Sequence, residues 1–212
     1  MINVLVVDDH VLIRKGMKQI QEDTDDMRVT GEAESGIQAL RMVRDNEYDM
    51  VLLDITLPDR HGMDILRQIR MARPTLPVLI LSMHPEGEYA MRSIRAGAAG
   101  YLNKQSAPSQ LVTAIRQVAS GRKYISNTLA EQLANELARG SEQREISHKI
   151  LSNREYQTLC LMASGKSLSE MAEIMSLSAK TVSVYRARML EKMKLKNNAE
   201  AVRYALNNHL ID

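Results

Sequence analysis

The chain has 212 residues, of which 44% are hydrophobic and 25% are charged, and its formal net charge is +2. These proportions are typical of an ordinary soluble globular protein, and the length allows one large or two modest domains. The first ten residues, MINVLVVDDH, hold two acids where a signal peptide needs an uninterrupted apolar stretch. No apolar run is long enough to cross a bilayer. We therefore expect a cytoplasmic protein that does not associate with membranes.

The charges are divided unevenly along the chain. Residues 1–120 carry 14 Lys and Arg against 16 Asp and Glu, whereas residues 151–212 carry 9 against 6. A small C-terminal excess of basic residues is by itself a weak indication of nucleic-acid binding. It agrees, however, with two parts of the chain that do different work.

Residues 1–120 alternate between strand and helix patterns. Short apolar runs typical of buried strands are separated by stretches in which apolar residues have helical spacing. Five such alternations predict a doubly wound, flavodoxin-like α/β domain with five parallel strands. The predicted strands are Val4–Val7, Val29–Ala33, Met50–Leu53, Val78–Leu81 and Gly100–Leu102.

Polar side chains follow these predicted strands where each strand ends. Asp54 closes the apolar run of the third strand, where an unpaired buried carboxylate would be costly, so we expect water or a cation beside it. A single strand-end aspartate is often only a turn former or a helix cap. In this architecture, however, functional groups collect at the carboxyl ends of the strands. The residues at these ends are Asp8, Asp9, Asp54, Ser82, Tyr101 and Lys104.

The chemistry of this set favours phosphoryl transfer. Three clustered carboxylates repel one another unless a cation neutralises them, and oxygen ligands suit Mg²⁺. Such a metal, with the Lys104 ammonium opposite, would hold the oxygens of a phosphoryl group in transfer to Asp54. Asp54 is then the nucleophile and acceptor. We expect Ser82 to hydrogen-bond the new phosphoryl oxygens and Tyr101 to swing according to the position of Ser82.

The stretches VLVVDDH, VLLDITLPDRHG, LILSM and GYLNK resemble the receiver domain of two-component response regulators, and we assign residues 1–120 to it. The resemblance implies that Asp54 is phosphorylated, with Lys104 and Ser82 in catalytic roles. It also implies that Ser82 and Tyr101 form the switch. The implied Mg²⁺ ligands are Asp9 and Asp54 directly, Asp8 through water, and the carbonyl of Thr56.

Other side chains that often serve as ligands or nucleophiles are interpreted as structural. The histidines at positions 10, 61, 84, 148 and 209 are scattered without the spacing of metal ligands, so none is assigned to a metal. His10, beside the acid pair, is interpreted as an exposed helix start rather than a catalytic base. Cys160 lies among apolar residues, which favours a buried reduced thiol over a disulfide or a nucleophile.

The pattern changes from Gly121 onward. Leu129, Leu133 and Leu137 recur at four-residue spacing, which predicts one short amphipathic helix. The following SEQREISHK is polar and has no apolar periodicity, as is typical of a tether. We assign residues 121–147 to a linker that contains this helix.

The pattern of residues 148–212 is helical throughout. Ser152 with Glu155, and Ser167 with Glu170, form capping-box signatures that predict two helix starts. A further helix, in KTVSVYRARMLEKM, follows the second of them after a short turn. Two short helices joined by a tight polar turn, the second rich in basic residues, are what a helix-turn-helix requires.

Helical periodicity divides this further helix into two faces. Val182, Met189 and Met193 lie on one side and should belong to the core. The opposite side and its flanks are predicted to reach base edges or phosphates in a major groove. A merely solvated face would explain Arg188 and Lys192 individually. The predicted DNA-contacting residues are Lys180, Thr181, Ser183, Val184, Ala187, Arg188 and Lys192.

The C-terminal part, from LSNREYQTL to AVRYAL, resembles the four-helix LuxR-type DNA-binding domain, which we assign to residues 148–212. A receiver followed by this domain is the pattern of NarL/FixJ-class transcriptional response regulators, and KTVSVYRARMLEKM most resembles the branch that includes GacA, UvrY and BvgA. The resemblance implies a sensor histidine kinase as phosphodonor, promoter DNA as target, and a homodimer when phosphorylated or DNA-bound. It implies no enzyme beyond phosphorylation and dephosphorylation of the receiver itself.

Two rival functions lack the residues that they would need, and one alternative remains. A hydrolase with Asp54 as nucleophile would need a second general acid two residues further on, where Thr56 stands. A dinucleotide-binding module would need a glycine-rich turn after the first strand, but the chain has VVDDHVLIRKG there. A receiver that acts only through protein contacts, without sequence-specific DNA binding, is the serious rival.

Overall fold

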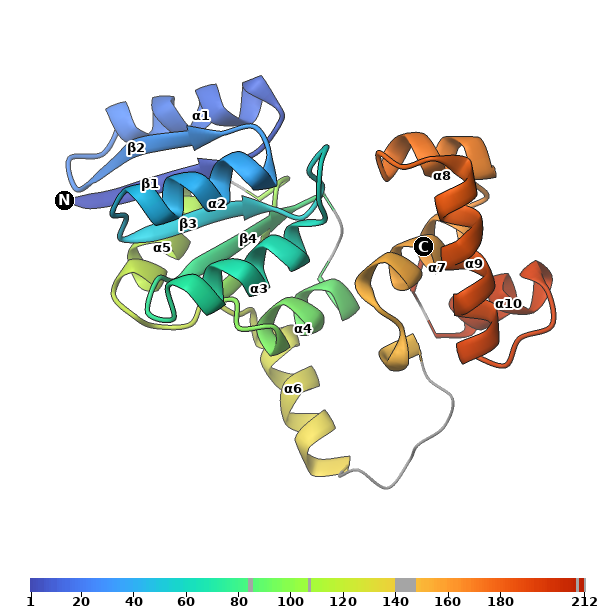
Figure 1. Ribbon diagram of the computed structural model, residues 1–212. Helices are drawn as coiled ribbons and strands as arrows, with labels where there is room; N and C mark the ends of the chain where they lie inside the picture. Colours follow the sequence, from blue (N-terminus) through green and yellow to red (C-terminus); the bar gives the residue numbers. More distant parts are fainter. Residues whose placement is uncertain (84–85, 107, 140–147, 209, 212) are drawn as a thin grey trace. The chain divides into compact units, whose positions relative to one another are not determined.

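The computed structural model describes residues 1–83, 86–106, 108–139, 148–208 and 210–211, and the chain divides into two compact units (Figure 1). The first unit is Met1–Ala138 and the second is Arg139–Asp212. Each unit has its own buried core, so each is described by itself. Most of the predicted tether, as well as His84 and His209, lies outside the described residues.

The first unit contains the predicted five-stranded parallel sheet, in the order β2-β1-β3-β4-β5. Each pair of neighbouring strands is parallel. The prediction of a doubly wound α/β fold is therefore confirmed. The strands are β1 Ile2–Val7, β2 Met27–Ala33, β3 Met50–Asp54, β4 Val78–Ser82 and β5 Gly100–Asn103.

Helices cover both faces of this sheet (Figure 1). One face packs against α1 and α5 through a cluster that includes Val4, Leu52, Met17 and Ile115, and α2, α3 and α4 cover the other face. Every residue of β3 and β4 is buried, which explains why both strands are continuous apolar runs. The helices are α1 Val11–Glu22, α2 Gly36–Asp45, α3 Gly62–Ala72, α4 Glu88–Arg95 and α5 Pro108–Ala119.

The helix predicted in the linker is present as α6, Asn127–Arg139, and it begins against the first unit. The backbone N–H of Tyr124 donates to the Ala99 carbonyl at 2.8 Å, which extends the chain alongside β5. The Ser126 hydroxyl caps the helix start by accepting from the Leu129 N–H at 3.1 Å, and it also donates to Glu86. Leu129 is buried. The helix start is therefore fixed to the rest of the first unit.

The second unit is made of helices, as predicted. Both predicted capping boxes are present: Ser152 and Glu155 open α7, and Ser167 and Glu170 open α8. Cys160 is buried, and it forms no disulfide within the part of the chain that the structure describes. The elements are a short 3-10 helix at His148–Ile150, then α7 Asn153–Ala163, α8 Leu168–Ile174, α9 Ala179–Lys192 and α10 Asn198–Asn207. Among the described residues, no helix has the length and apolar character needed to span a membrane.

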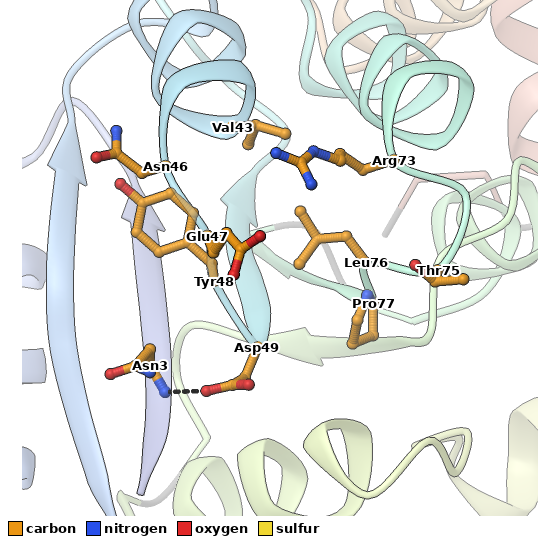
Figure 2. Close-up of a pocket in the computed structure, with 10 residues that line it drawn as sticks. All are labelled: Asn3, Val43, Asn46, Glu47, Tyr48, Asp49, Arg73, Thr75, Leu76 and Pro77. Carbon is orange, nitrogen blue, oxygen red and sulfur yellow. Dashed lines mark hydrogen bonds between the residues drawn. The ribbon is translucent and has the colours of Figure 1, made fainter.

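A hollow of about 330 Å³ opens at the amino-terminal edge of the sheet (Figure 2). Asn3 near the start of β1, Asp49 just before β3 and Pro77 just before β4 line it. Two of these lining residues are joined, since the Asn3 N–H donates to the Asp49 carboxylate at 2.6 Å. The hollow is therefore separate from the strand ends that carry the predicted site.

Candidate phosphoryl-transfer site and helix-turn-helix

The carboxyl ends of three strands bring an acidic pair of side chains and one ammonium group together. Asp8 follows β1, Asp54 ends β3, and Lys104 follows β5. The Lys104 Nζ lies 2.7 Å from an Asp8 carboxylate oxygen and 2.7 Å from Asp54 Oδ2, to which it donates. Asp8 and Asp54 are 1% and 2% exposed. The sheet order accounts for this meeting, since β3 lies beside β1 and only β4 separates it from β5.

The segment that leads into α1 adds the Asp9 carboxylate and the His10 ring to this edge. His10 is the N-cap residue of α1 and its side chain is 60% exposed, which agrees with its interpretation as an exposed helix start. Its ring Nδ1 lies 3.0 Å from Asp8 Oδ1 and 2.8 Å from Asp9 Oδ1. The ring thus bridges the acid pair, a contact that the sequence did not reveal.

Burial and the Lys104 ammonium act in opposite directions on the pKa of Asp54. Removal from water raises the pKa of the Asp54 carboxyl to about 6, against the opposing attraction of the Lys104 ammonium. Burial also works to lower the pKa of Lys104, but Asp54 and Asp8 together outweigh it and raise that pKa above its ordinary value. Lys104 is therefore charged at neutral pH, while the acidic groups outnumber it.

These residues fit a divalent cation. The ligand atoms of Asp8, Asp9, His10 and Asp54 all lie within 4.8 Å of one another. Three carboxylates face one ammonium group, so the cluster carries an excess of negative charge that a small, oxygen-preferring cation would neutralise. The acidic pocket is thus suited to Mg²⁺ or a cation of similar chemistry.

The loop after β3 is held against the sheet and α2. The Thr56 N–H donates to Asp54 Oδ1 at 3.1 Å, so the backbone helps to orient the carboxylate. Asp59 accepts from the N–H groups of Gly36 and Ile37 at 2.8 Å each, which ties the loop to the start of α2. Gly62 opens α3 against the Asp54 backbone, where an added Cβ would lie only 2.2 Å from the Asp54 carbonyl oxygen. The loop therefore leaves little freedom for Thr56.

Ser82 and Tyr101 lie side by side next to this edge. Ser82 ends β4 with 0% exposure, and its carbonyl accepts from the Lys104 N–H at 2.8 Å. Tyr101 of β5 is also 0% exposed, and its side chain hydrogen-bonds Ser82. Burial raises the pKa of Tyr101 to about 12. In this structure the Tyr101 ring therefore points inward, away from solvent.

In the second unit, α9 has the two faces that periodicity predicts. Val182, Met189 and Met193 are at most 2% exposed and pack inside the helical unit. Ser178 caps α9 by accepting from the Thr181 N–H at 3.1 Å. The opposite side is exposed at Lys180, Val184, Ala187 and Arg188, and Thr181 and Ser183 are half-buried at its flanks.

Lys192, near the end of this face, has an acidic partner within the unit. Its ammonium donates to Glu155 Oε2 at 2.7 Å, and the Glu155 side chain is 4% exposed. The same Glu155 carboxylate accepts from the Ser152 N–H at 2.8 Å in the capping box. Lys192 therefore joins the end of α9 to the start of α7.

A five-stranded parallel sheet of this order, with a lysine-bridged acidic pocket at its carboxyl edge, is a receiver domain. Residues 4–116 match the family described as the response regulator receiver domain. Residues 149–205 match bacterial regulatory proteins of the luxR family.

Full-length relatives agree with both matches. The response regulator UvrY of Escherichia coli K12 is 38% identical over 210 residues, which are 99% of this chain and 96% of the relative. The response regulator GacA of Pseudomonas aeruginosa is 34% identical over 212 residues, covering 100% and 99%.

Solved structures show the same architecture. A LuxR-family two-component response regulator from Aurantimonas has 33% identity and a TM-score of 0.60, covering 65% of this chain and 99% of that one. RcsB from Salmonella enterica serovar Typhimurium, solved bound to the rprA promoter with a phosphomimetic, has a TM-score of 0.64 over 96% and 97%. At 23% identity, RcsB supports the fold alone.

The chain belongs to the two-component response regulators, with a receiver domain and a LuxR-type DNA-binding domain. The prediction of the branch that includes UvrY and GacA is confirmed. The family consists of transcription regulators rather than catalytic enzymes.

Proposed function

We propose that Asp54 is the phosphoacceptor whose phosphorylation controls promoter binding by α9. The observation that carries this proposal is the buried Asp54 carboxylate bridged to Lys104 at 2.7 Å beside a second acid. A buried acid with a raised pKa and a single cationic partner is a common feature of functional sites.

The transfer itself needs little more than position and charge. An oxygen of the ionised Asp54 carboxylate attacks the phosphorus of the donor, and the bond from phosphorus to the donor's leaving atom breaks. The leaving group takes the bonding electron pair. Lys104 lies where its ammonium can neutralise a phosphoryl oxygen, and the Ser82 hydroxyl is next to this edge.

Mg²⁺ is the cofactor that suits these residues. We propose Asp9 and Asp54 as direct ligands, Asp8 as a ligand through water, and the Thr56 carbonyl as the remaining protein ligand. When bound, the ion supplies positive charge for the oxygens of the transferred phosphoryl group. The carboxylate donor set within 4.8 Å supports this assignment. Ser82 and Tyr101 are proposed as the switch pair, because their side chains already hydrogen-bond each other.

The DNA-contacting surface is proposed on the exposed side of α9. Lys180 and Arg188 are placed to meet phosphates, whereas Ser183 and Val184 are placed to meet base edges. Thr181 and Ala187 complete the surface, and Lys192 adds a charge from the last turn, which it shares with Glu155. The relative named as RcsB binds promoter DNA in its solved complexes, and dimers of it have been solved on DNA.

The family to which the chain belongs suggests its partners. A receiver implies a sensor histidine kinase as phosphodonor. We propose promoter DNA as the target, a homodimer as the DNA-binding form, and the cytoplasm as the place where all of these meet. The competing function, a receiver that signals only through protein contacts, requires that the LuxR-type unit bind no specific DNA.

Two measurements test the proposal. Purified protein with Mg²⁺ and acetyl phosphate should gain one phosphoryl group in its intact mass, and Asp54→Asn should gain none. Full labelling of Asp54→Asn would refute the assignment. Selection from a random duplex library should enrich a common motif with wild-type protein. Failure to enrich any sequence would favour the competing function.

A further inference from the structure

Arg14 is a charged residue of α1 that is 6% exposed, which is rare for an arginine. Its Nη1 donates to the backbone carbonyl of Asp8 at 2.8 Å. Its Nη2 donates to the Glu34 carboxylate, and its Nε lies 3.6 Å from a Glu32 carboxylate oxygen. The guanidinium therefore joins the first acid of the pocket to the end of β2 and the residue after it.

The Asp8 carbonyl needs this donor. The Asp8 N–H still continues the sheet ladder by donating to the Ala33 carbonyl at 3.0 Å, but β1 ends at Val7. A buried carbonyl beyond the end of a ladder is costly unless another group donates to it. Arg14 provides that hydrogen bond from the following helix.

The same carbonyl belongs to the peptide unit between Asp8 and Asp9. Because a peptide unit is planar, a fixed direction of the Asp8 carbonyl also fixes the orientation of the Asp9 N–H and the position of the Asp9 Cα. The Asp8 side chain is already held through His10 and Lys104. Asp9 shares the His10 contact, at 2.8 Å, but its side chain is 38% exposed, so its direction depends more on the backbone.

We propose that Arg14 is a positioning residue for the acid pair. By holding the Asp8 carbonyl and Glu34 at once, it fixes the peptide unit that aims both carboxylates toward a divalent cation. A lysine cannot reproduce this planar, two-point grip. The inference rests on the proposed Mg²⁺ site. Residues that orient metal ligands without touching the ion commonly change metal affinity 10- to 100-fold.

The test is Mg²⁺ affinity of the full chain by isothermal titration calorimetry, without any phosphodonor. Arg14→Met should bind Mg²⁺ at least about tenfold more weakly than wild type. The matched control is Lys18→Met, one turn later in α1. Lys18 also pairs with Glu32, at 2.6 Å, so this variant removes the same charge from the same helix. We expect its Mg²⁺ affinity to stay within about twofold of wild type, since surface ion pairs have small effects.

Equal Mg²⁺ affinity of Arg14→Met and Lys18→Met would overturn the proposal, because Arg14 would then serve the fold alone. If Arg14→Met does not fold, as judged by circular dichroism, Arg14→Lys takes its place. Wild-type affinity in Arg14→Lys would likewise overturn the two-point grip. One outcome overturns the role of Arg14 but leaves the proposed function intact. In that outcome wild type is phosphorylated on Asp54 with Mg²⁺, and the Arg14 variants bind Mg²⁺ as tightly as wild type does. If wild type binds no Mg²⁺, the proposed metal site fails with it.

Discussion

At the scale of single residues, the site depends on side chains that the surrounding backbone holds in fixed places. Asp54 is buried at a strand end, and its neighbours on three sides are Lys104, the Thr56 N–H and the start of α3. Such a carboxylate has few alternative positions. The position of this carboxylate therefore depends in part on groups that do not contact the phosphodonor.

Gly62 is the clearest of these positions. An alanine Cβ there would lie 2.2 Å from the Asp54 carbonyl oxygen and 2.7 Å from Ile55 Cα, and neither backbone atom can move cheaply. We expect Gly62→Ala to lower the free energy of unfolding by about 1–3 kcal/mol, the usual cost of overpacking. Urea unfolding followed by circular dichroism measures this. The Gly62→Ala substitution should also slow phosphorylation of Asp54.

The control for this change is Gly16→Ala in α1, where an added Cβ meets nothing within 4 Å. An alanine in an exposed helix position is favoured over glycine by roughly 0.5–1 kcal/mol, so this variant should be slightly more stable than wild type. A Gly62→Ala protein as stable as Gly16→Ala would contradict the close approach described here.

Part of this site could be predicted from the sequence. Asp8, Asp9, Asp54 and Lys104 each follow a recognisable strand, and parallel strands place their carboxyl ends at one edge. Arg14 and Gly62 were missed. Nothing in their immediate surroundings distinguishes a buried arginine from a solvated one, or a tightly packed glycine from a helix start. Their roles come from distant segments that only the fold brings near.

At the scale of elements, the strands and the helix starts were the most predictable features. Continuous apolar runs identified β3 and β4 because both are fully buried, and the two capping boxes marked α7 and α8. The attachment of α6 to the first unit was not foreseen. It depends on Ser126 and Tyr124, whose partners, Glu86 and Ala99, are distant in the chain.

The exposed side of α9 has a testable division of labour. Lys180→Ala and Arg188→Ala should weaken binding to a selected duplex and make its affinity less dependent on salt. Binding releases counterions from each phosphate that the protein neutralises, so a variant with fewer phosphate contacts releases fewer of them. Substitutions at Ser183 or Val184 should instead change the preferred sequence. Fluorescence anisotropy at several salt concentrations measures both effects. Unchanged affinity, salt slope and sequence preference in all four variants would exclude this face.

The ion pair between α7 and α9 predicts a pH dependence. Burial works to raise the pKa of Glu155, but its hydrogen bonds with Lys192 and Ser152 outweigh burial and hold that pKa below its usual 4.5. A carboxyl whose pKa is depressed in the folded state stabilises the protein above its unfolded pKa. That stability is lost as the pH falls through the folded pKa. Glu155→Gln should therefore cost about 1–2 kcal/mol at pH 7.

The difference from wild type should shrink as the pH falls from the unfolded-state pKa of about 4.5 through the lower folded-state pKa, at which the native carboxylate itself becomes protonated. Thermal unfolding across pH 3 to 7 follows this. Glu170→Gln changes the equivalent residue of the α8 capping box, which is exposed, so its effect should be smaller. A Glu155→Gln defect that is independent of pH would show that the charge of Glu155 is unimportant.

At the scale of the whole molecule, the central question is how phosphorylation of the first unit changes DNA binding by the second. Ser82 and Tyr101 connect the phosphoacceptor edge to β5, and the charge of Glu86 acts on the Tyr101 hydroxyl. Glu86 also accepts from Ser126 at the start of α6. The hydrogen bond between Ser82 and Tyr101, the charge of Glu86 and its bond with Ser126 form the route by which we expect phosphorylation of Asp54 to affect α6. We expect the protein to exchange between a state with low and a state with high DNA affinity. Phosphorylation shifts this equilibrium only as far as it stabilises one state more than the other.

The most direct test of this account is a DNA titration with and without phosphorylation of Asp54. Wild type and Asp54→Asn are incubated with Mg²⁺ and acetyl phosphate, the phosphoryl content is read from the intact mass, and each protein is titrated onto a selected duplex. Sedimentation of the same samples gives the oligomeric state. A coupling of about 1–3 kcal/mol predicts roughly 5- to 150-fold tighter, dimeric binding for phosphorylated wild type alone. Unchanged affinity and oligomeric state at full phosphorylation would contradict the account.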